Sequence, residues 1–187
     1  MTEKINVSVG KALLEIARRS IGKQLGLLIE QETQPEGEIF FQEYATFVTL
    51  KLNNQLRGCI GNLAPSGSLL DSVTRNAINA AFHDHRFSPL ELKEFDQVEI
   101  DISVLGKPNK IDYQSAADLI DRLTPGVDGV ILELGRARAT FLPQVWQQLP
   151  DPISFLTQLC LKAGLPANCW KTDKPDIYLY QVKSFSE

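Results

Sequence analysis

The spacing of apolar residues predicts two long amphipathic helices near the start of the chain. Apolar side chains recur every three or four positions over residues 13–28 and again over residues 69–82, which is the period of a helix with one buried face. Ser8 and Ser68 precede these stretches, and a serine side chain there can accept hydrogen bonds from the first free N–H groups. Two shorter helices are predicted farther along, over residues 115–123 and 151–164.

Strict alternation of apolar and polar residues predicts the strands. The clearest strand covers residues 98–105, and residues 44–60 form a predicted hairpin around Asn53-Asn54, a pair that tolerates positive φ angles. A second hairpin is predicted over residues 130–142, and a last strand over 177–182. Because hairpins join neighbouring strands, we expect an α+β fold with a largely antiparallel sheet and flanking helices.

Length, composition and charge indicate a globular protein and disfavour two other classes, nucleic-acid-binding and membrane-spanning proteins. The 187 residues contain 43% hydrophobic and 22% charged residues, which is typical of a globular chain with one domain or two small lobes. The net charge is −4, from 19 basic and 23 acidic residues. Nucleic-acid binding is therefore disfavoured, because such proteins usually carry a basic face. No apolar run is long enough to predict a membrane span, and the oligomeric state stays open.

The cysteine pattern predicts a reduced protein. The three cysteines lie at positions 59, 160 and 169, and no Cys-x-x-Cys occurs. An odd number without paired spacing indicates neither a disulfide framework nor a zinc site. Together with the absence of an apolar leader in residues 1–10, this predicts a cytoplasmic protein. Cys160 falls on an apolar helical stripe and is predicted to lie in the core.

The densest potential chemistry lies in residues 56–61, Leu-Arg-Gly-Cys-Ile-Gly. In an extended strand Leu56 and Ile60 would face the core, and Arg57 and Cys59 would share the other face. A cation beside a thiol favours the nucleophilic thiolate. Gly58 between them would allow a backbone or ligand to approach closely. Equally, Cys59 can be a small packed side chain and Arg57 a surface residue, and the pattern leaves both interpretations open.

Other polar residues add candidates but no second clear motif. Asp84 and Arg86 follow the second helix, beside His83 and His85. Histidines two positions apart do not share a helical face, so we predict no metal site there. Asp128 lies in a glycine-rich turn. The chain has no phosphate loop of the P-loop or dinucleotide type, and we expect no cofactor.

Residues 56–61 resemble the six-residue signature of the AMMECR family, named for the AMME-syndrome chromosomal region. Prokaryotic members are called protein A of the AmmeMemoRadiSam system. Asp84-His85-Arg86-Phe87 departs from the family's Asp-Pro-Arg-Phe, which argues against His85 as a required ligand. The similarity extends over residues 9–185 in order and spacing, including the segments at 47–50, 80–82, 89–90, 125–129, 140–146, 149–150 and 159–165.

The resemblance implies a single AMMECR domain over residues 1–187 with two unequal lobes. The larger lobe would span approximately residues 8–110 plus 177–183, and the smaller lobe approximately 111–175. It also implies a cleft near their junction that contains the signature. The name of the prokaryotic system implies an association with a Memo-like protein and a radical S-adenosylmethionine protein.

Two hypotheses follow, and whether the protein is an enzyme stays open. In the first, Cys59 is a nucleophile or redox thiol, and Arg57 lowers its pKa or holds an anionic substrate. Asp84, Arg86 and Asp128 would line that site. In the second, the protein is a non-catalytic binding or assembly module. Arg57 would then recognise a small anionic molecule or protein partner, with Gly58 and Gly61 permitting close approach and Cys59 only packing.

Overall fold

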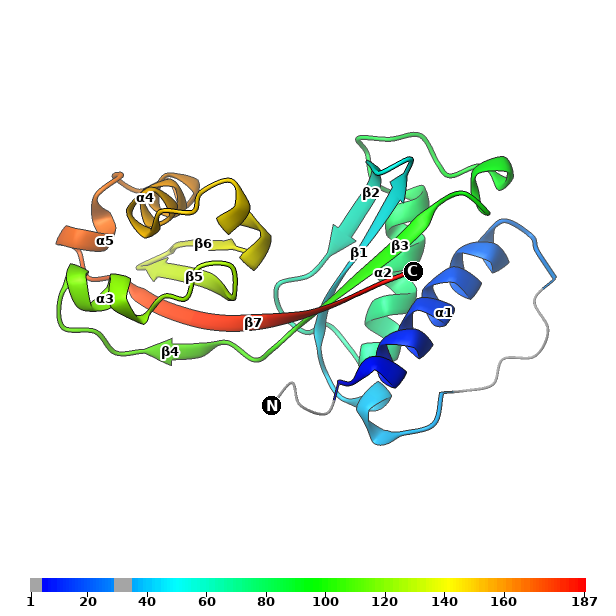
Figure 1. Cartoon of the computed structure of the whole chain (residues 1–187), viewed down its shortest axis with the longest axis horizontal. Coiled ribbons are helices and arrows are strands. Elements are labelled where there is room, and N and C mark those ends of the chain that lie inside the picture. The colour runs from blue at the N-terminus through cyan, green and yellow to red at the C-terminus, as the bar shows by residue number, and fades with distance from the viewer. Residues whose placement is uncertain (1–4, 29–34) are drawn as a thin grey trace. The chain divides into compact units, whose positions relative to one another are not determined.

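The computed structural model describes residues 5–28 and 35–187, which form two compact units. The first unit comprises the chain up to Gly106 together with Lys183–Glu187, and the second comprises Lys107–Val182. The strand β7 (Asp176–Ser186) is divided between the two units (Figure 1). Each unit has its own hydrophobic core.

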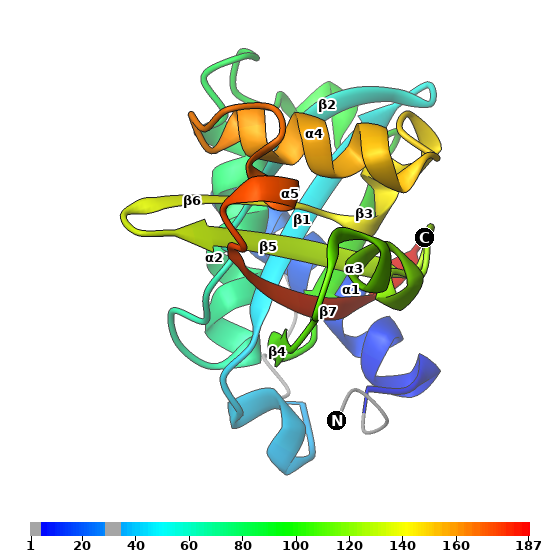
Figure 2. The same cartoon turned by 90° about the vertical axis from the view of Figure 1, so that its left-hand side faces the viewer.

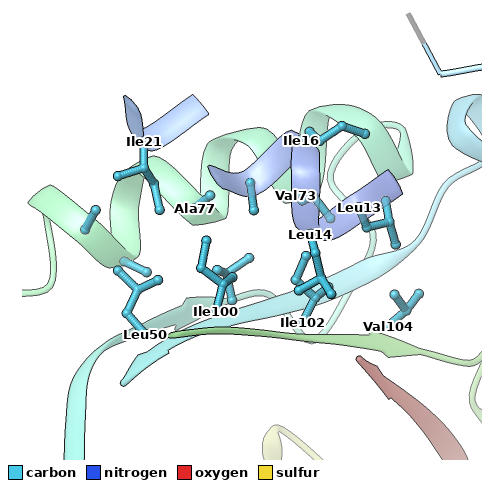
Figure 3. Close-up of a cluster of buried hydrophobic side chains, with 14 of the residues drawn as sticks. Leu13, Leu14, Ile16, Ile21, Leu50, Val73, Ala77, Ile100, Ile102 and Val104 are labelled. Atoms are coloured by element: carbon cyan, nitrogen blue, oxygen red, sulfur yellow. The ribbon is translucent and has the colours of Figure 1, made fainter. Parts of the chain in front are cut away.

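The first unit is a layer of two helices on an antiparallel sheet. The strands β1 (Ala45–Leu52), β2 (Gln55–Gly61) and β3 (Glu99–Leu105) pair in the order β2-β1-β3, which leaves β2 at the edge. The helices are α1 (Val7–Gln24) and α2 (Leu69–Phe82). Figure 3 shows apolar side chains of both helices pointing toward those of the strands. The labelled members of this core are Leu13, Leu14, Ile16, Ile21, Leu50, Val73, Ala77, Ile100, Ile102 and Val104.

The ends of these elements follow from local hydrogen bonding. Helix α1 is capped by Asn6, whose side chain accepts from the Val9 N–H at 3.0 Å. The prediction that Ser8 caps it is wrong, because Asn6 is an equally good cap that stands earlier in the chain. Ser68 does cap α2, accepting from the Asp71 N–H at 3.1 Å.

The end of the chain is fastened within the first unit. The last part of β7 lies next to β3, and the Glu187 N–H donates to the Ile100 carbonyl. Arg18 of α1 forms an ion pair with Glu187 and donates to the Phe95 and Val98 carbonyls. One guanidinium therefore ties together α1, the segment before β3 and the end of β7.

The second unit is another antiparallel sheet with helices over it. β7 pairs with β4 on one side and with β5 on the other, and β6 pairs with β5. Figure 2, which faces this unit, shows its helices gathered over the strands. Its strands are β4 (Asn109–Ile111), β5 (Asp128–Leu134) and β6 (Ala137–Phe141). Its helices are α3 (Ala116–Arg122), α4 (Pro152–Lys162), α5 (Cys169–Thr172) and the 3₁₀ turn η4 (Pro143–Gln147).

A disulfide joins Cys160 of α4 to Cys169 of α5. The prediction of no disulfide is wrong, because sequence spacing does not show that the chain turns back after α4. Gly164, with φ +74°, makes this turn and lets α5 pack on α4. Both cysteines are fully buried in the core of the second unit, so the predicted core position of Cys160 is confirmed.

The predicted fold class is confirmed, since helices cover antiparallel sheets in both units. The turns at Asn53-Asn54 and Gly135-Arg136 join the two expected hairpins. The short elements β4 and α5 were not expected. No helix within residues 5–28 and 35–187 is long and apolar enough to cross a bilayer.

Candidate functional site at the signature strand

The signature strand β2 contains a β-bulge at Arg57. Leu50 of β1 is opposite Gly58, whereas the next residue, Lys51, is opposite Leu56. Arg57 is therefore an extra residue in the ladder, and a bulge of this kind changes the face on which the following side chains lie. Leu56 is 44% exposed. The prediction that it faces the core is wrong, because the alternation is broken between Leu56 and Gly58.

The two signature glycines are required by the protein's own packing. A Cβ atom on Gly58 would lie 2.1 Å from the carbonyl oxygen of Ala80 in α2. A Cβ atom on Gly61 would lie 2.3 Å from the Phe47 ring and 2.4 Å from the Thr46 carbonyl oxygen. Helix α2 can approach β2 this closely only if position 58 has no side chain. A role for either glycine toward a ligand stays a prediction.

The guanidinium of Arg57 is engaged by the segment that follows α2. It forms a two-point ion pair with Glu94, with Nε–Oε1 at 2.9 Å and Nη2–Oε2 at 3.0 Å. It also donates to the carbonyls of Ser88, at 2.9 Å, and Pro89, at 3.3 Å. The hydrogen bonds from Arg57 hold the pKa of Glu94 below its ordinary value, against an opposing effect of burial. Arg57 thus fastens residues 88–94 to the edge of the sheet.

The backbone of Cys59 is held by an ion pair. Its N–H donates to Asp84 Oδ2 at 2.9 Å, and its carbonyl accepts from Arg86 Nη2 at 3.3 Å. Because β2 is an edge strand, these two groups would otherwise lack a partner strand. The side chains of Asp84 and Arg86 take the place of that strand. The Cys59 sulfur itself is half-buried and accepts from Thr49 Oγ1 at 3.2 Å.

Asp84 and Arg86 form a bidentate pair with unequal exposure. The contacts are Nε–Oδ1 at 2.9 Å and Nη2–Oδ2 at 2.6 Å. The Asp84 side chain is 2% exposed, whereas that of Arg86 is 48% exposed. The pKa of Asp84 lies far below its ordinary value, mainly because Arg86 donates hydrogen bonds to the carboxylate; burial acts in the opposite direction. The pKa of Arg86 is raised chiefly by Asp84 and also by the nearby Cys59.

Asp128 belongs to the second unit and closes its own turn. Its carboxylate accepts from the Thr124 N–H at 2.8 Å. Its carbonyl accepts from Trp146 Nε1 at 2.7 Å. The structure thus brings Cys59, Asp84 and Arg86 into direct contact and directs Arg57 to Glu94. Asp128 makes its hydrogen bonds inside the other unit.

Sequence reasoning missed Glu94 and Thr49. Glu94 is 37 positions from Arg57, and no local pattern links the two. A two-residue turn fixes the register of a hairpin, so the sequence could in principle show which residue of β1 lies opposite Cys59. Without a bulge, that register would place Thr49 opposite Gly58. The bulge shifts the register by one residue and places Thr49 opposite Cys59.

The arrangement offers a thiol, a threonine hydroxyl and a half-exposed guanidinium. No histidine or carboxylate hydrogen-bonds the Cys59 sulfur in the part of the chain that the structure describes. No three His, Cys, Asp or Glu side chains cluster there as a metal site would require. Activation of a cysteine nucleophile usually relies on an adjacent base or cation, and the cation here is Arg86 rather than Arg57.

These features define an α+β protein of two units, with a bulged, glycine-containing edge strand held by two ion pairs. The chain belongs to the AMMECR1 family, whose model matches residues 14–185. A protein of Methanothermobacter thermautotrophicus is 37% identical over 95% of this chain and 94% of its own length. A protein of Methanopyrus kandleri is 33% identical over the whole of this chain and 92% of its own.

A solved structure shares the fold. The crystal structure of the uncharacterized protein PH0010 from Pyrococcus horikoshii matches with a TM-score of 0.79 and 34% sequence identity. The match covers 95% of this chain and 91% of that one. The family and its fold are thereby established for this chain, and its function is a matter for proposal.

Proposed function

We propose that this protein is a non-catalytic binding module that recognises a small anionic molecule or a protein partner through the surface around Leu56–Gly61. The observation that carries the proposal is the engagement of all three guanidinium nitrogens of Arg57 by Glu94 and two backbone carbonyls. A guanidinium used in this way builds a rigid surface and is not free to activate Cys59. Rigid surfaces bind with less loss of conformational entropy.

Arg86 is the group we assign to recognition. Half of its side chain is exposed, while Asp84 fixes its direction. A held guanidinium with remaining N–H donors suits carboxylate and phosphate groups. Thr49 of β1, opposite Cys59 of β2, would contribute a polar contact, whereas Cys59 would only pack. In the proposal this surface belongs to a cleft, as the family resemblance implies.

The resemblance also supplies the partners to test. We propose a cytoplasmic protein that acts with a Memo-like protein and a radical S-adenosylmethionine protein. Binding of each purified partner to the full chain can be measured by biolayer interferometry, with Cys59→Ser and Arg86→Gln variants. We expect Cys59→Ser to bind as the parent does. We expect Arg86→Gln to weaken binding about tenfold, which is the effect of losing a charge-assisted hydrogen bond.

A control and a thermal melt make this experiment decisive. Arg138→Gln removes an exposed arginine that also pairs with a carboxylate, that of Glu133, and should leave binding unchanged. Thermal melting of each variant separates a lost contact from a lost fold. The proposal fails if neither partner binds the parent chain, or if Cys59→Ser abolishes binding while melting normally.

A reactive thiol is the second candidate, and one observation favours it. Cys59 is half-buried and is not bonded to another cysteine, and Arg86 Nη2 donates to its carbonyl at 3.3 Å. A nearby cation and partial exposure are features that reactive cysteines share. The rate of alkylation by iodoacetamide near neutral pH distinguishes the candidates. A rate clearly above that of a model thiol supports reactivity, and a rate at or below it supports the binding module.

A further inference from the structure

Two helices of this protein begin with the same arrangement of serine, aspartate and arginine. In both, a serine caps the helix, an aspartate follows three positions later, and an arginine follows four positions after that. The residues are Ser68, Asp71 and Arg75 in α2, and Ser115, Asp118 and Arg122 in α3. The pair of helices therefore provides a comparison inside one molecule.

The charges pair in α3 but not in α2. Arg122 Nε contacts Asp118 Oδ1 at 2.8 Å, as is usual for opposite charges four residues apart on a helix. In α2, Arg75 instead donates through Nη2 to the carbonyl and the hydroxyl of Ser66. Asp71 Oδ2 accepts from the Ser68 hydroxyl at 2.7 Å. Neither Asp71 nor Arg75 forms an ion pair with any residue in the described ranges 5–28 and 35–187.

Helix capping does not explain this separation. Asp118 also supports the start of its helix, because its second oxygen accepts from the Gln114 N–H at 2.8 Å while the first pairs with Arg122. An aspartate at this position can therefore cap and pair at once. In α2 the preceding turn diverts the arginine, and the two opposite charges are left apart.

A hollow of about 440 Å³ lies at the separated charges, within the range of about 300–1,000 Å³ that small-molecule sites occupy. Asp71 and Arg75 line it together with the hydroxyl-bearing Thr74, the amide of Asn79 and the apolar side chain of Ile78. A guanidinium has five N–H donors, and Ser66 uses those of only one nitrogen. Both charges thus keep unused hydrogen-bonding capacity at the hollow.

We propose that this hollow binds a small zwitterion of the amino-carboxylate class, of which free α-amino acids are the simplest members. The ligand's carboxylate contacts Arg75, its ammonium contacts Asp71, and its aliphatic part lies against Ile78. A ligand with one charge gains one contact and is repelled by the other group, whereas a zwitterion satisfies both. The site shares no residue with the signature surface, so it is independent of the proposed function.

The test is an NMR titration of the ¹⁵N-labelled full chain. Glycine, L-leucine, β-alanine and 4-aminobutyrate vary the side chain and the separation of the two charges. Acetate and methylammonium supply each charge alone. We expect saturable shifts of the backbone amides of residues 66–79 with at least one zwitterion. With either singly charged compound we expect the apparent affinity from the titration to be about tenfold weaker, because one charge-assisted contact is lost.

Matched variants locate the binding groups. Arg75→Gln and Asp71→Asn should each weaken binding about tenfold. Asparagine keeps a side-chain oxygen that can accept from the Ser68 hydroxyl, and Ser68 remains the N-cap, so the helix is retained. Arg122→Gln, at the equivalent position of α3, should change nothing. The proposal is overturned if residues 66–79 show no saturable shift, if acetate binds as well as the zwitterions, or if both α2 variants bind like the parent.

Discussion

Arg57 and Glu94 meet in a two-point ion pair at the edge of the first unit, and only 12% and 18% of their side chains are exposed. The bulge in β2 gives Arg57 its place in this pair, because the extra residue leaves the regular ladder. The most conspicuous cation of the signature is therefore a structural tie between β2 and residues 88–94. Because Arg57 is used in this structural contact, Arg86 is the arginine that we assign to ligand recognition.

Removing this tie should destabilise the protein. Arg57→Gln leaves Glu94 without its counter-charge in a largely buried place and takes a donor from two carbonyls. We expect the free energy of unfolding to fall by about 2–4 kcal/mol, since a partly buried charge is left unpaired. Urea denaturation followed by circular dichroism measures this change.

A double-mutant cycle separates the pair from its surroundings. Arg57→Gln combined with Glu94→Gln should cost less than the sum of the two single changes, because no unpaired charge remains. Arg138→Gln, which breaks an exposed pair with Glu133, should cost less than about 1 kcal/mol. Equal costs for the buried and exposed arginines would contradict the structural role of Arg57.

The Asp84 carboxylate should make stability fall in acid. Its pKa in the folded protein is depressed, mainly by Arg86, while in the unfolded chain it returns to about 3.9. Below that pH the unfolded chain binds a proton that the native protein does not, so stability decreases as pH falls. Above it the contribution is fully present. Glu94 acts in the same direction.

Asp84→Asn tests this dependence directly. The variant should be less stable near neutral pH and should lose less stability than the parent between pH 6 and pH 3, as measured by urea denaturation at each pH. His85→Ala, at the next position, serves as the control and should keep the parent's slope. A slope in Asp84→Asn as steep as that of the parent would show that other carboxylates carry the acid sensitivity.

Local patterns predicted most elements, but not the contacts of the site. Capping at Ser68 and the Asn53-Asn54 turn depend on neighbouring residues, so the sequence displays them. At the bulge, Gly58 lies against Ala80 and Arg57 pairs with Glu94. Both partners lie more than 20 positions away, and alternation within β2 alone could not show them. The ion pair of Asp84 with Arg86 is local by contrast, since only one residue separates the two.

The cysteines show the same limit. Their number and spacing indicated free thiols, and yet Cys160 and Cys169 pair across a turn between two helices. Nine positions of separation carry no signal unless the end of α4 and the return of α5 are known. The sequence did show that Cys160 lies on the apolar face of a helix. That pattern predicts that its side chain is buried, but it does not predict which cysteine it is bonded to.

Gly58 should tolerate no side chain. In Gly58→Ala the new Cβ would overlap the backbone carbonyl of Ala80, and a backbone atom cannot rotate out of the way. We expect a loss of at least about 3 kcal/mol, at the upper end of overpacking effects, with faster hydrogen exchange in α2 and β2. In Gly135→Ala the space is open and only the positive φ is unfavourable, at about 1–2 kcal/mol. Similar losses in the two variants would mean that α2 is not held against β2 at Gly58.

The disulfide predicts the alkylation pattern of the unfolded chain. In denaturant without a reductant, iodoacetamide should modify only Cys59, because Cys160 and Cys169 are joined. After reduction all three cysteines should react, which mass spectrometry counts directly. Cys160→Ala with Cys169→Ala should lower the free energy of unfolding by about 2–4 kcal/mol, since the cross-link restricts the unfolded chain. Three alkylated cysteines without any reductant would show that the two thiols are packed together but not bonded in the purified protein.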